Sequence, residues 1–445
     1  MLPGGGNLRY DRMPPLWVPL RAFLVAPFLG ATAGVVVAAA GSRTLDNRFT
    51  GELLGGLHLL TLGFLTLVMV GAIVQVLPVV TGANVPYTSV VGPTTQAALI
   101  LGVPAMAWGL ARGSRPAAGI GAVILGVGLG VFTLSVLAGA WGARRNVTGR
   151  AMALAVVSLV VVAGLGVSFL AGHAGWGPLR RDLTDVHLGW ALAGWVGLLV
   201  IGVSFQVVPM FQVTPAYPRW IQEYLPPALF ASLVLWTVGR IGDRVRVADA
   251  GILLVCGLLG IYGGTTLWLQ AHRRRRLRDV TTDCWRLGMV SLLAACLTVA
   301  AGVLGLVDLG ETRVSITLGV VAIVGFGVSV VTGMLYKIVP FLSWLHLQNL
   351  LTENHLMGGV KVRNMRQLLP VSGPRNQFLA HLVAYAMLLA SPWLARGPGG
   401  WVRWAGVALT VDLSWLGFEL LAVVSRHTED RALVESHLPP DTPTV

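Results

Sequence analysis

Apolar runs of about 20 residues or more recur along almost the whole chain, and this feature limits the possible folds most strongly. A helix needs roughly 20 apolar residues to cross a hydrocarbon core of about 30 Å, because each residue advances the helix by about 1.5 Å. Backbone amides are not left unpaired in lipid, so such runs have to be helical. The pattern predicts an all-α polytopic membrane protein without a soluble domain of ordinary size.

Twelve apolar runs can be counted between charged or Gly- and Pro-rich breaks. They lie near residues 17–40, 52–80, 90–111, 117–142, 150–172, 184–212, 226–242, 247–271, 284–307, 313–345, 377–395 and 401–425. The composition agrees, because 55% of the residues are hydrophobic and only 11% are charged, unlike in soluble domains. We therefore expect one integral membrane domain over residues 1–445, surrounded by the lipid bilayer.

Basic residues exceed acidic ones, and the formal net charge is +13. Five arginines between residues 273 and 278 occupy a loop that falls on the same side as the N-terminus in a twelve-helix topology. The positive-inside rule then predicts a multi-pass protein of a bacterial-type inner (plasma) membrane with both termini in the cytoplasm. Because topology accounts for the charge, we do not expect nucleic acid as a partner.

Several motifs for cofactors and nucleotides do not occur in the sequence. The three cysteines show no C-x-x-C spacing, so we expect neither a zinc site nor a disulfide. The chain contains no C-x-x-C-H motif, which argues against covalent attachment of haem c, and no G-x-x-x-x-G-K-[ST] motif, which argues against an ATP-driven pump.

An internal repeat with a spacing of 131 residues is the strongest pattern in the sequence. The second, sixth and tenth runs carry it, as Gly63, Gly71, Gln75 and Pro78, then Gly194, Gly202, Gln206 and Pro209, then Gly325, Gly333, Lys337 and Pro340. Three copies of four helices, over about 17–142, 150–271 and 284–425, predict three pseudo-threefold-related four-helix arcs with these three helices inside. Residues 346–376 and 427–445 are then a cytoplasmic loop and a cytoplasmic tail.

The repeated residues fall into two groups with different expected roles. The glycines are expected to let helices approach closely, and the prolines to end or kink a helix. The polar members Gln75, Gln206 and Lys337 are expected to form a layer near the cytoplasmic face. This layer serves either packing or a polar route from the cytoplasm, with Lys337 reaching towards water.

Two histidines lie inside predicted spans, where an unpartnered imidazole is costly and a functional role is the default. His58, in GGLHLLTLGF, lies near the outer end of the second helix, and His187, in DVHLGWALAGW, lies at the same level of the sixth. Neutral imidazole is a common axial ligand of haem iron. We expect His58 to bind haem iron and His187 to bind haem or copper, with hydrogen-bonded core histidines as the alternative.

The last predicted helix carries two acids. Asp412 and Glu419 are seven residues apart, so they share one face. Such intramembrane acids either pass protons or form a structural ion pair, for which Arg396 and Arg403 are close in sequence.

Three further histidines are expected nearer to water. His381 is expected at the cytoplasmic interface without a cofactor. His346 and His355 fall in the predicted long cytoplasmic loop, where they are solvated or contact a partner.

Twelve helices in three arcs, with a histidine near the outer end of helix two, resemble the haem-copper oxidase subunit I superfamily. A narrower local match involves helix two. The stretches HLLTLGF, beginning at His58, and LPVVTG, ending at Gly82, are similar to the H-x4-G-F and P-x2-T-G helix of the NnrS family. That family comprises twelve-helix membrane proteins that contain haem and copper and are linked to nitric oxide metabolism. The DVHLGW stretch also resembles the H-L-W of nitric oxide reductase helix six.

The resemblance implies a b-type haem with His58 as the counterpart of a low-spin haem ligand, and His187 as the counterpart of a copper ligand. Two departures limit it. Residues 313–345 contain no histidine, and the seventh and eighth helices lack paired copper histidines. A three-histidine copper opposite a high-spin haem is therefore not expected, and neither is oxygen reduction with proton pumping.

The sequence thus favours a haem-b-binding protein, with copper as a further candidate cofactor, in nitric oxide or redox-stress metabolism. Whether it catalyses a reaction stays open, and a conventional terminal oxidase is not expected. One alternative is a cofactor-free transporter or channel for a small solute that uses Lys337, Asp412 and Glu419. Another is a membrane subunit that docks an electron donor or other redox partner through the loop from 346 to 377.

Overall fold

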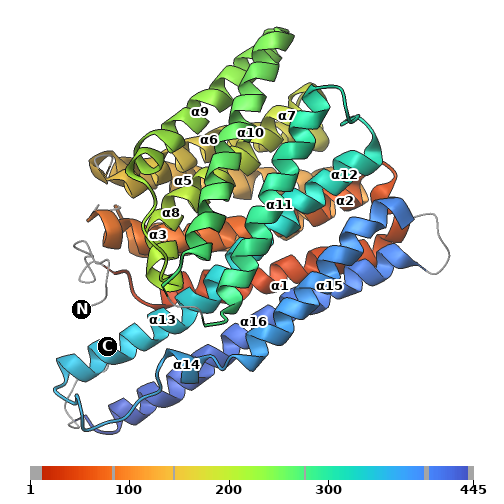
Figure 1. The fold of residues 1–445 in the computed structure, drawn as a ribbon. Helices are drawn as coiled ribbons and strands as arrows, with labels where there is room; N and C mark the ends of the chain where they lie inside the picture. The colour runs from red at the N-terminus through yellow and green to blue at the C-terminus, as the bar shows by residue number, and fades with distance from the viewer. Residues whose placement is uncertain (1–12, 83–85, 144–145, 275–276, 395–399, 439–445) are drawn as a thin grey trace.

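The computed structural model describes residues 13–82, 86–143, 146–274, 277–394 and 400–438. Within these ranges the chain is helical, without strands, and twelve helices are long and apolar enough to cross a membrane (Figure 1). The prediction of twelve spans is confirmed. Some residues named above lie outside the described ranges. They are Arg396, two arginines of the 273–278 cluster, the end of the predicted tail, and the basic N-terminal residues Arg9 and Arg12.

Nine spans are single helices and three are composite. The single helices are α1 (Trp17–Ala40), α4 (Thr88–Arg112), α5 (Arg115–Ala143), α6 (Val147–Ala174), α9 (Arg219–Ile241), α10 (Val245–Ala271), α11 (Val280–Val303), α15 (Ser372–Leu394) and α16 (Trp401–Glu435). The composite spans are α2–η3–α3 (Gly51–His58, Leu59–Thr66, Leu67–Thr81), α7–η5–α8 (Thr184–Gly189, Trp190–Gly197, Leu198–Gln212) and α12–η6–α13 (Thr312–Val320, Val321–Val328, Ser329–Glu353). Short helices η2 (Gly41–Leu45), η4 (Arg181–Leu183) and α14 (Met365–Leu368) complete the described fold.

The bundle has two ends, which we name by the chain. The terminal face is the end at which α1 begins and α16 ends, and the distal face is the end at which α1 ends and α16 begins. Neighbours in sequence pack together, as in α4 with α5, α5 with α6, and α10 with α11. The last helix, α16, packs against the first, α1, so the succession of packed helices closes on itself.

The three composite spans are the most buried. In the second and sixth spans 78% of the most apolar segment is buried, and in the tenth 56%, against at most 50% in the others described. η6 contacts both η3 and η5. The indole Nε1 of Trp195 donates to the Thr66 hydroxyl over 3.0 Å, which joins the second span to the sixth. These helices therefore form the centre of the molecule.

Each composite span contains a π-helical stretch, and the three stretches keep the sequence repeat. η3, η5 and η6 are eight residues long and begin 131 residues apart, so both ends coincide in all three copies. A π-helix places one more residue in each turn than an α-helix and is often found beside functional sites. The register of the repeat is thus present in the backbone as well as in the sequence.

The repeated glycines lie where helices touch. A Cβ atom on Gly71 would lie 2.9 Å from the Cβ of Ala22, and one on Gly202 would lie 2.8 Å from the Cβ of Ala151. A Cβ on Gly333 would lie 2.8 Å from the Cβ of Cys284. The neighbour in each case belongs to the first helix of the same repeat. The expectation that these glycines permit close packing is confirmed.

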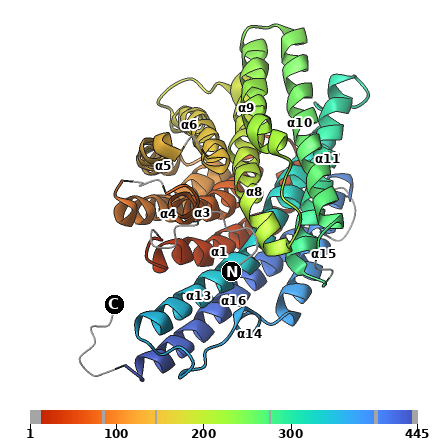
Figure 2. The same cartoon turned by 60° about the vertical axis from the view of Figure 1, so that its left-hand side comes forward.

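Two helices run further than predicted on the terminal face. α13 continues to Glu353 and α16 to Glu435, so residues 346–353 and 427–435 are helical instead of loop and tail. The 35 residues of α16 span about 52 Å, well beyond a hydrocarbon core of about 30 Å. Figures 1 and 2 show both helices projecting past the other spans. They persist because they pack on each other and on the returning chain, burying Leu351 and Val434.

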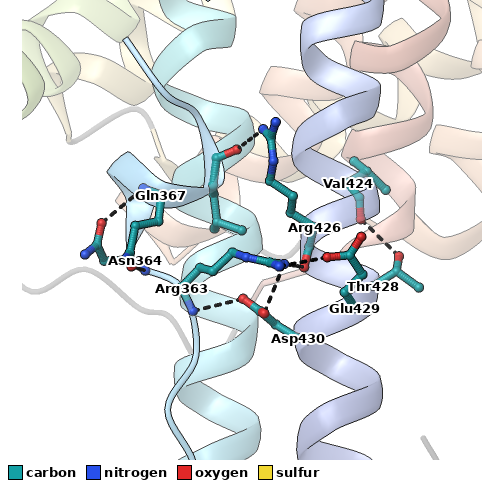
Figure 3. A network of polar contacts seen from close by, with 9 residues as sticks. Arg363, Asn364, Gln367, Val424, Arg426, Thr428, Glu429 and Asp430 are labelled. Atoms are coloured by element: carbon teal, nitrogen blue, oxygen red, sulfur yellow. Dashed lines mark hydrogen bonds and ion pairs between the residues drawn. The ribbon is translucent and has the colours of Figure 1, made fainter.

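The segment between α13 and α15 is fastened to α16 by a polar network (Figure 3). Arg363 pairs with Glu429 over 2.8 Å and with Asp430 over 3.2 Å, and its guanidinium also donates to the carbonyl of Arg426. Arg426 donates in turn to the carbonyl of Leu368 over 2.8 Å. We call α13 from 341 onwards, residues 354–371 and α16 from 422 onwards the terminal extension.

Candidate cofactor cavity

A cavity of about 890 Å³ opens into the distal half of the bundle. All three composite spans line it, together with parts of α5, α6, α9, α10 and α11. Its volume falls within the range of small-molecule and cofactor sites, about 300–1,000 Å³. Most lining side chains are aliphatic or aromatic, and the polar exceptions are few, so each of them is a candidate for contact with a ligand.

His58 and His187 both line this cavity, on different composite spans, with ring centres 6.3 Å apart and ring planes inclined by 35°. The repeat explains why they meet. His58 immediately precedes η3, and His187 precedes η5 by three residues, so the two differ in register by only two residues, or about 3 Å along a helix. The structure thus brings together the two histidines that the sequence singled out separately.

The hydrogen bonding of His58 determines its tautomer. Its Nδ1 lies 2.8 Å from the carbonyl oxygen of Leu54, which can only accept, so Nδ1 carries the hydrogen and donates. The lone pair of a neutral ring is then on Nε2. A ligating histidine usually has this arrangement, in which one nitrogen is fixed by a carbonyl and the other is left for the metal.

His187 is held by packing instead. Its ring lies edge-on to Phe169, with centres 5.5 Å apart, and a Cβ on Gly166 would lie 3.3 Å from its Cε1. Its Nδ1 is buried without a hydrogen-bond partner among the described residues. A buried ring nitrogen with no well-formed hydrogen bond is available to a ligand in the cavity.

The distance between the rings suits one metal ion. Histidine nitrogens bind metals at about 2.0–2.1 Å, so ring centres 6.3 Å apart are close enough for both histidines to hold one metal. Within the described residues no group of three or more His, Cys, Asp or Glu side chains could hold a metal ion. Haem iron takes only one or two protein ligands, so it is the metal centre that this donor set fits best.

Arginines surround the distal mouth of the cavity. Asp185 accepts from Arg48 over 3.1 Å and from Arg240 over 3.2 Å, and Arg181 lies over the same Phe49 ring as Arg48. The three basic residues and Asp185 all line the cavity. Asp243 and Asp249 line the cavity as well, so three carboxylates balance the three guanidinium groups, and the mouth offers polar contacts of both signs to a ligand.

The predicted polar layer lies apart from the cavity. Lys337 pairs with Asp279 over 2.8 Å, and both side chains are about one quarter exposed. Asp279 caps α11 at the terminal face by accepting from the amide of Thr281. Gln75 is buried in α3, and Gln206, in α8, is partly buried. Of these three residues, Lys337 has an ion-pair partner, which gives its charge a place at the membrane boundary.

Asp412 pairs with a histidine and not with an arginine. Its carboxylate lies 2.8 Å from Nδ1 of His381 and accepts from Gln377 over 2.6 Å. Arg403, one expected partner, donates instead to the carbonyls of Ala38 and Ala39. Glu419 is half-buried and accepts from the indole of Trp415 over 3.2 Å.

His381 was expected at the interface, and this is wrong because the ring is fully buried between α13 and α16. A spacing of four residues from Gly373 through Gln377 to His381 puts all three on one face of α15. This pattern, opposite the acids of α16, is the sequence signal that could have identified it.

His346 also differs from its expected place. It lies in α13, with Nδ1 3.2 Å from Nε2 of His427 on α16, so these histidines join the two helices of the terminal extension.

Cys256 and Cys296 line the cavity, and sequence reasoning assigned them no role.

Comparison of the sequence with protein-family models and with curated proteins gives no match. Any assignment of function therefore depends on the residues and geometry described above.

Proposed function

We propose that the cavity binds a b-type haem with its iron between His58 and His187, and that the protein serves nitric oxide or redox-stress metabolism. The observation that carries this proposal is the pair of imidazoles across one cavity, 6.3 Å apart. The tautomer of His58, which leaves Nε2 free, and the largely apolar lining of the cavity support it. When bound, such a haem would supply one-electron redox chemistry.

The rings of His58 and His187 differ in the hydrogen bonds that orient them. Leu54 orients the ring of His58 by a hydrogen bond, whereas no described hydrogen bond orients the Nδ1 side of His187. Partners of this kind raise the basicity of a ligand and fix its position. His58 and His187 would together hold the haem, with His58 the more firmly oriented of the two. The choice of nitric oxide comes from the likeness of helix two to the NnrS family.

The finer architecture belongs to the same proposal. Three four-helix arcs are supported by the equal spacing of η3, η5 and η6 and by the equivalent glycine contacts. The terminal face is assigned to the cytoplasm of a bacterial-type inner membrane. Support comes from the basic residues on it, among them Arg273, Arg274 and Arg278 between α10 and α11.

The test is a spectrum of the purified full-length protein, oxidised and reduced with dithionite, with a pyridine haemochrome assay and metal analysis. We expect one b-type haem per chain, lost in His58→Ala and shifted or five-coordinate in His187→Ala. His173→Ala is the matched control, because His173 also lines the cavity but its ring does not belong to the contact between His58 and His187. Protein that lacks haem after expression with ample haem supply would refute the proposal. If the protein contains copper but no haem, copper is the cofactor in place of haem. If it contains neither, the alternative of a cofactor-free transporter is favoured.

A further inference from the structure

A second polar site lies inside the bundle, away from the histidine pair of the cavity. Asp412, His381, Gln377 and Ser329 are all fully buried, and Tyr336 is nearly so. They come from α13, α15 and α16, and hydrogen bonds join them into one chain. An ionisable side chain inside a membrane protein is costly to keep, so it usually has a function.

The hydrogen bonds form a ladder between the helices. The Tyr336 hydroxyl donates to Gln377 over 2.9 Å, and the Gln377 amide donates to Asp412. Asp412 meets Nδ1 of His381, and Nε2 of His381 lies 2.8 Å from the hydroxyl of Ser329. The ladder therefore runs from Tyr336, about two turns into α13, to Ser329, the first residue of the same helix.

Proton counting fixes the state of the pair. The hydroxyl of Ser329 donates to the carbonyl of Val324 over 3.2 Å, and with its single hydrogen used there it accepts from Nε2 of His381. One further proton then lies between Nδ1 of His381 and Asp412, either as imidazolium and carboxylate or as imidazole and carboxylic acid. Both forms have the same net charge, and among the described residues Asp412 has no other ionic partner.

The hydrogen-bonded ladder lies between the terminal face and the cavity. Glu419 lies two turns, or about 10 Å, from Asp412 on the same face of α16 and packs against Gly373 in the first turn of α15, at the terminal face. At the other end Val324, which holds Ser329, lines the cavity, as does Leu409, one turn from Asp412. Other titratable groups on the packed helices are Tyr336, which bonds Gln377, and Cys284, which packs at Gly333 of α13.

We propose that Asp412 and His381 form a buried site for one exchangeable proton, supplied from the terminal face by way of Glu419 and connected through Ser329 to the wall of the cavity. In the transfer itself the proton leaves the Asp412 carboxyl oxygen for Nδ1 of His381, or returns, without change of net charge. Gln377 and Tyr336 are positioning residues that hold the carboxylate in line with the imidazole. The site does not depend on haem.

The experiment is infrared difference spectroscopy of the full-length protein in a lipid film during exchange of H₂O for D₂O and during changes of pH. We expect a carboxyl band that shifts in D₂O and vanishes in Asp412→Asn, and an imidazole band of His381 that shifts in the same variant. The amide keeps the acceptor for Gln377 and has the same size, so the fold should persist. In Glu419→Gln the same bands should remain but exchange more slowly.

Tyr385→Phe is the matched control, because its hydroxyl bonds Ser291 of α11 and makes no hydrogen bond to the ladder. Bands that do not exchange with D₂O, or that exchange at the same rate in Glu419→Gln, would show a static structural pair and overturn the proposal. If Asp412→Asn fails to fold, Glu419→Gln carries the test alone. Haem content is measured separately on each variant, so loss of the haem proposal and loss of this one are distinguishable.

Discussion

Gly202 offers the sharpest test of how the repeat packs. Alanine there would place a Cβ 2.8 Å from the Cβ of Ala151, about 1 Å inside ordinary contact at about 3.5–4.0 Å. α6 and α8 must then separate, or the backbone must shift. Overpacking of this kind costs about 1–3 kcal/mol, whereas the loss of glycine from a helix returns about 0.5–1 kcal/mol. We expect a net loss of about 0.5–2 kcal/mol in the free energy of unfolding.

The assay is the thermal midpoint of unfolding in detergent, followed by tryptophan fluorescence and by the fraction of monodisperse protein. Gly202→Ala should lower the midpoint by on the order of 2 °C. Gly164→Ala is the matched control, because a Cβ there meets nothing within 4 Å, and it should leave the midpoint unchanged or slightly higher. Ala151→Gly in the Gly202→Ala background removes the colliding methyl group and should restore part of the loss. A Gly202→Ala protein as stable as wild type, or a double variant without recovery, would refute the reasoning.

Three further predictions concern single contacts. Trp195→Phe removes the buried bond to Thr66 and should cost about 1–2 kcal/mol, and a double-mutant cycle with Thr66→Val should return most of that cost as coupling. Asp279→Asn keeps the cap on Thr281 but loses the ion pair with Lys337, whose side chains are about one quarter exposed. Its midpoint should therefore fall by less than that of Asp279→Ala, which loses both contacts. Arg363→Ala should speed protease cleavage between 354 and 371, because it removes both ion pairs to α16. Arg366→Ala should not, because the described hydrogen bond of Arg366 is made by its backbone amide. Equal cleavage rates in the two variants would mean that Arg363 does not hold the segment.

The number of spans and the register of the repeat were predictable because both depend on local sequence. An apolar run must be helical in lipid whatever its neighbours are, so twelve runs give twelve spans. The spacing of Gly63, Gly194 and Gly325 predicted equivalent places in three helices, and η3, η5 and η6 keep that spacing. The π-helical form itself was not predictable, since no residue type in these stretches requires it.

The ends of helices were predicted less well where their stability comes from outside the membrane. The charged and polar residues after 345 and after 425 suggested a loop and a tail. They remain helical because α13 and α16 support each other and are tied down by Arg363. Similarly, α9 begins at Arg219, before the predicted position 226, because Ile221 and Leu225 bury one face of its first turns.

By itself, the sequence determined the class of the protein, the count and level of its spans, and the residues whose burial in lipid needs an explanation. His58, His187 and Asp412 were identifiable because a polar group in an apolar run is costly wherever the helix lies. Their partners were decided only by the tertiary structure. Which face of a helix meets which neighbour depends on rotation about its axis, and close packing at many distant positions sets that rotation. His58 therefore met His187 across a cavity, and Asp412 met His381 where proximity in sequence had suggested an arginine.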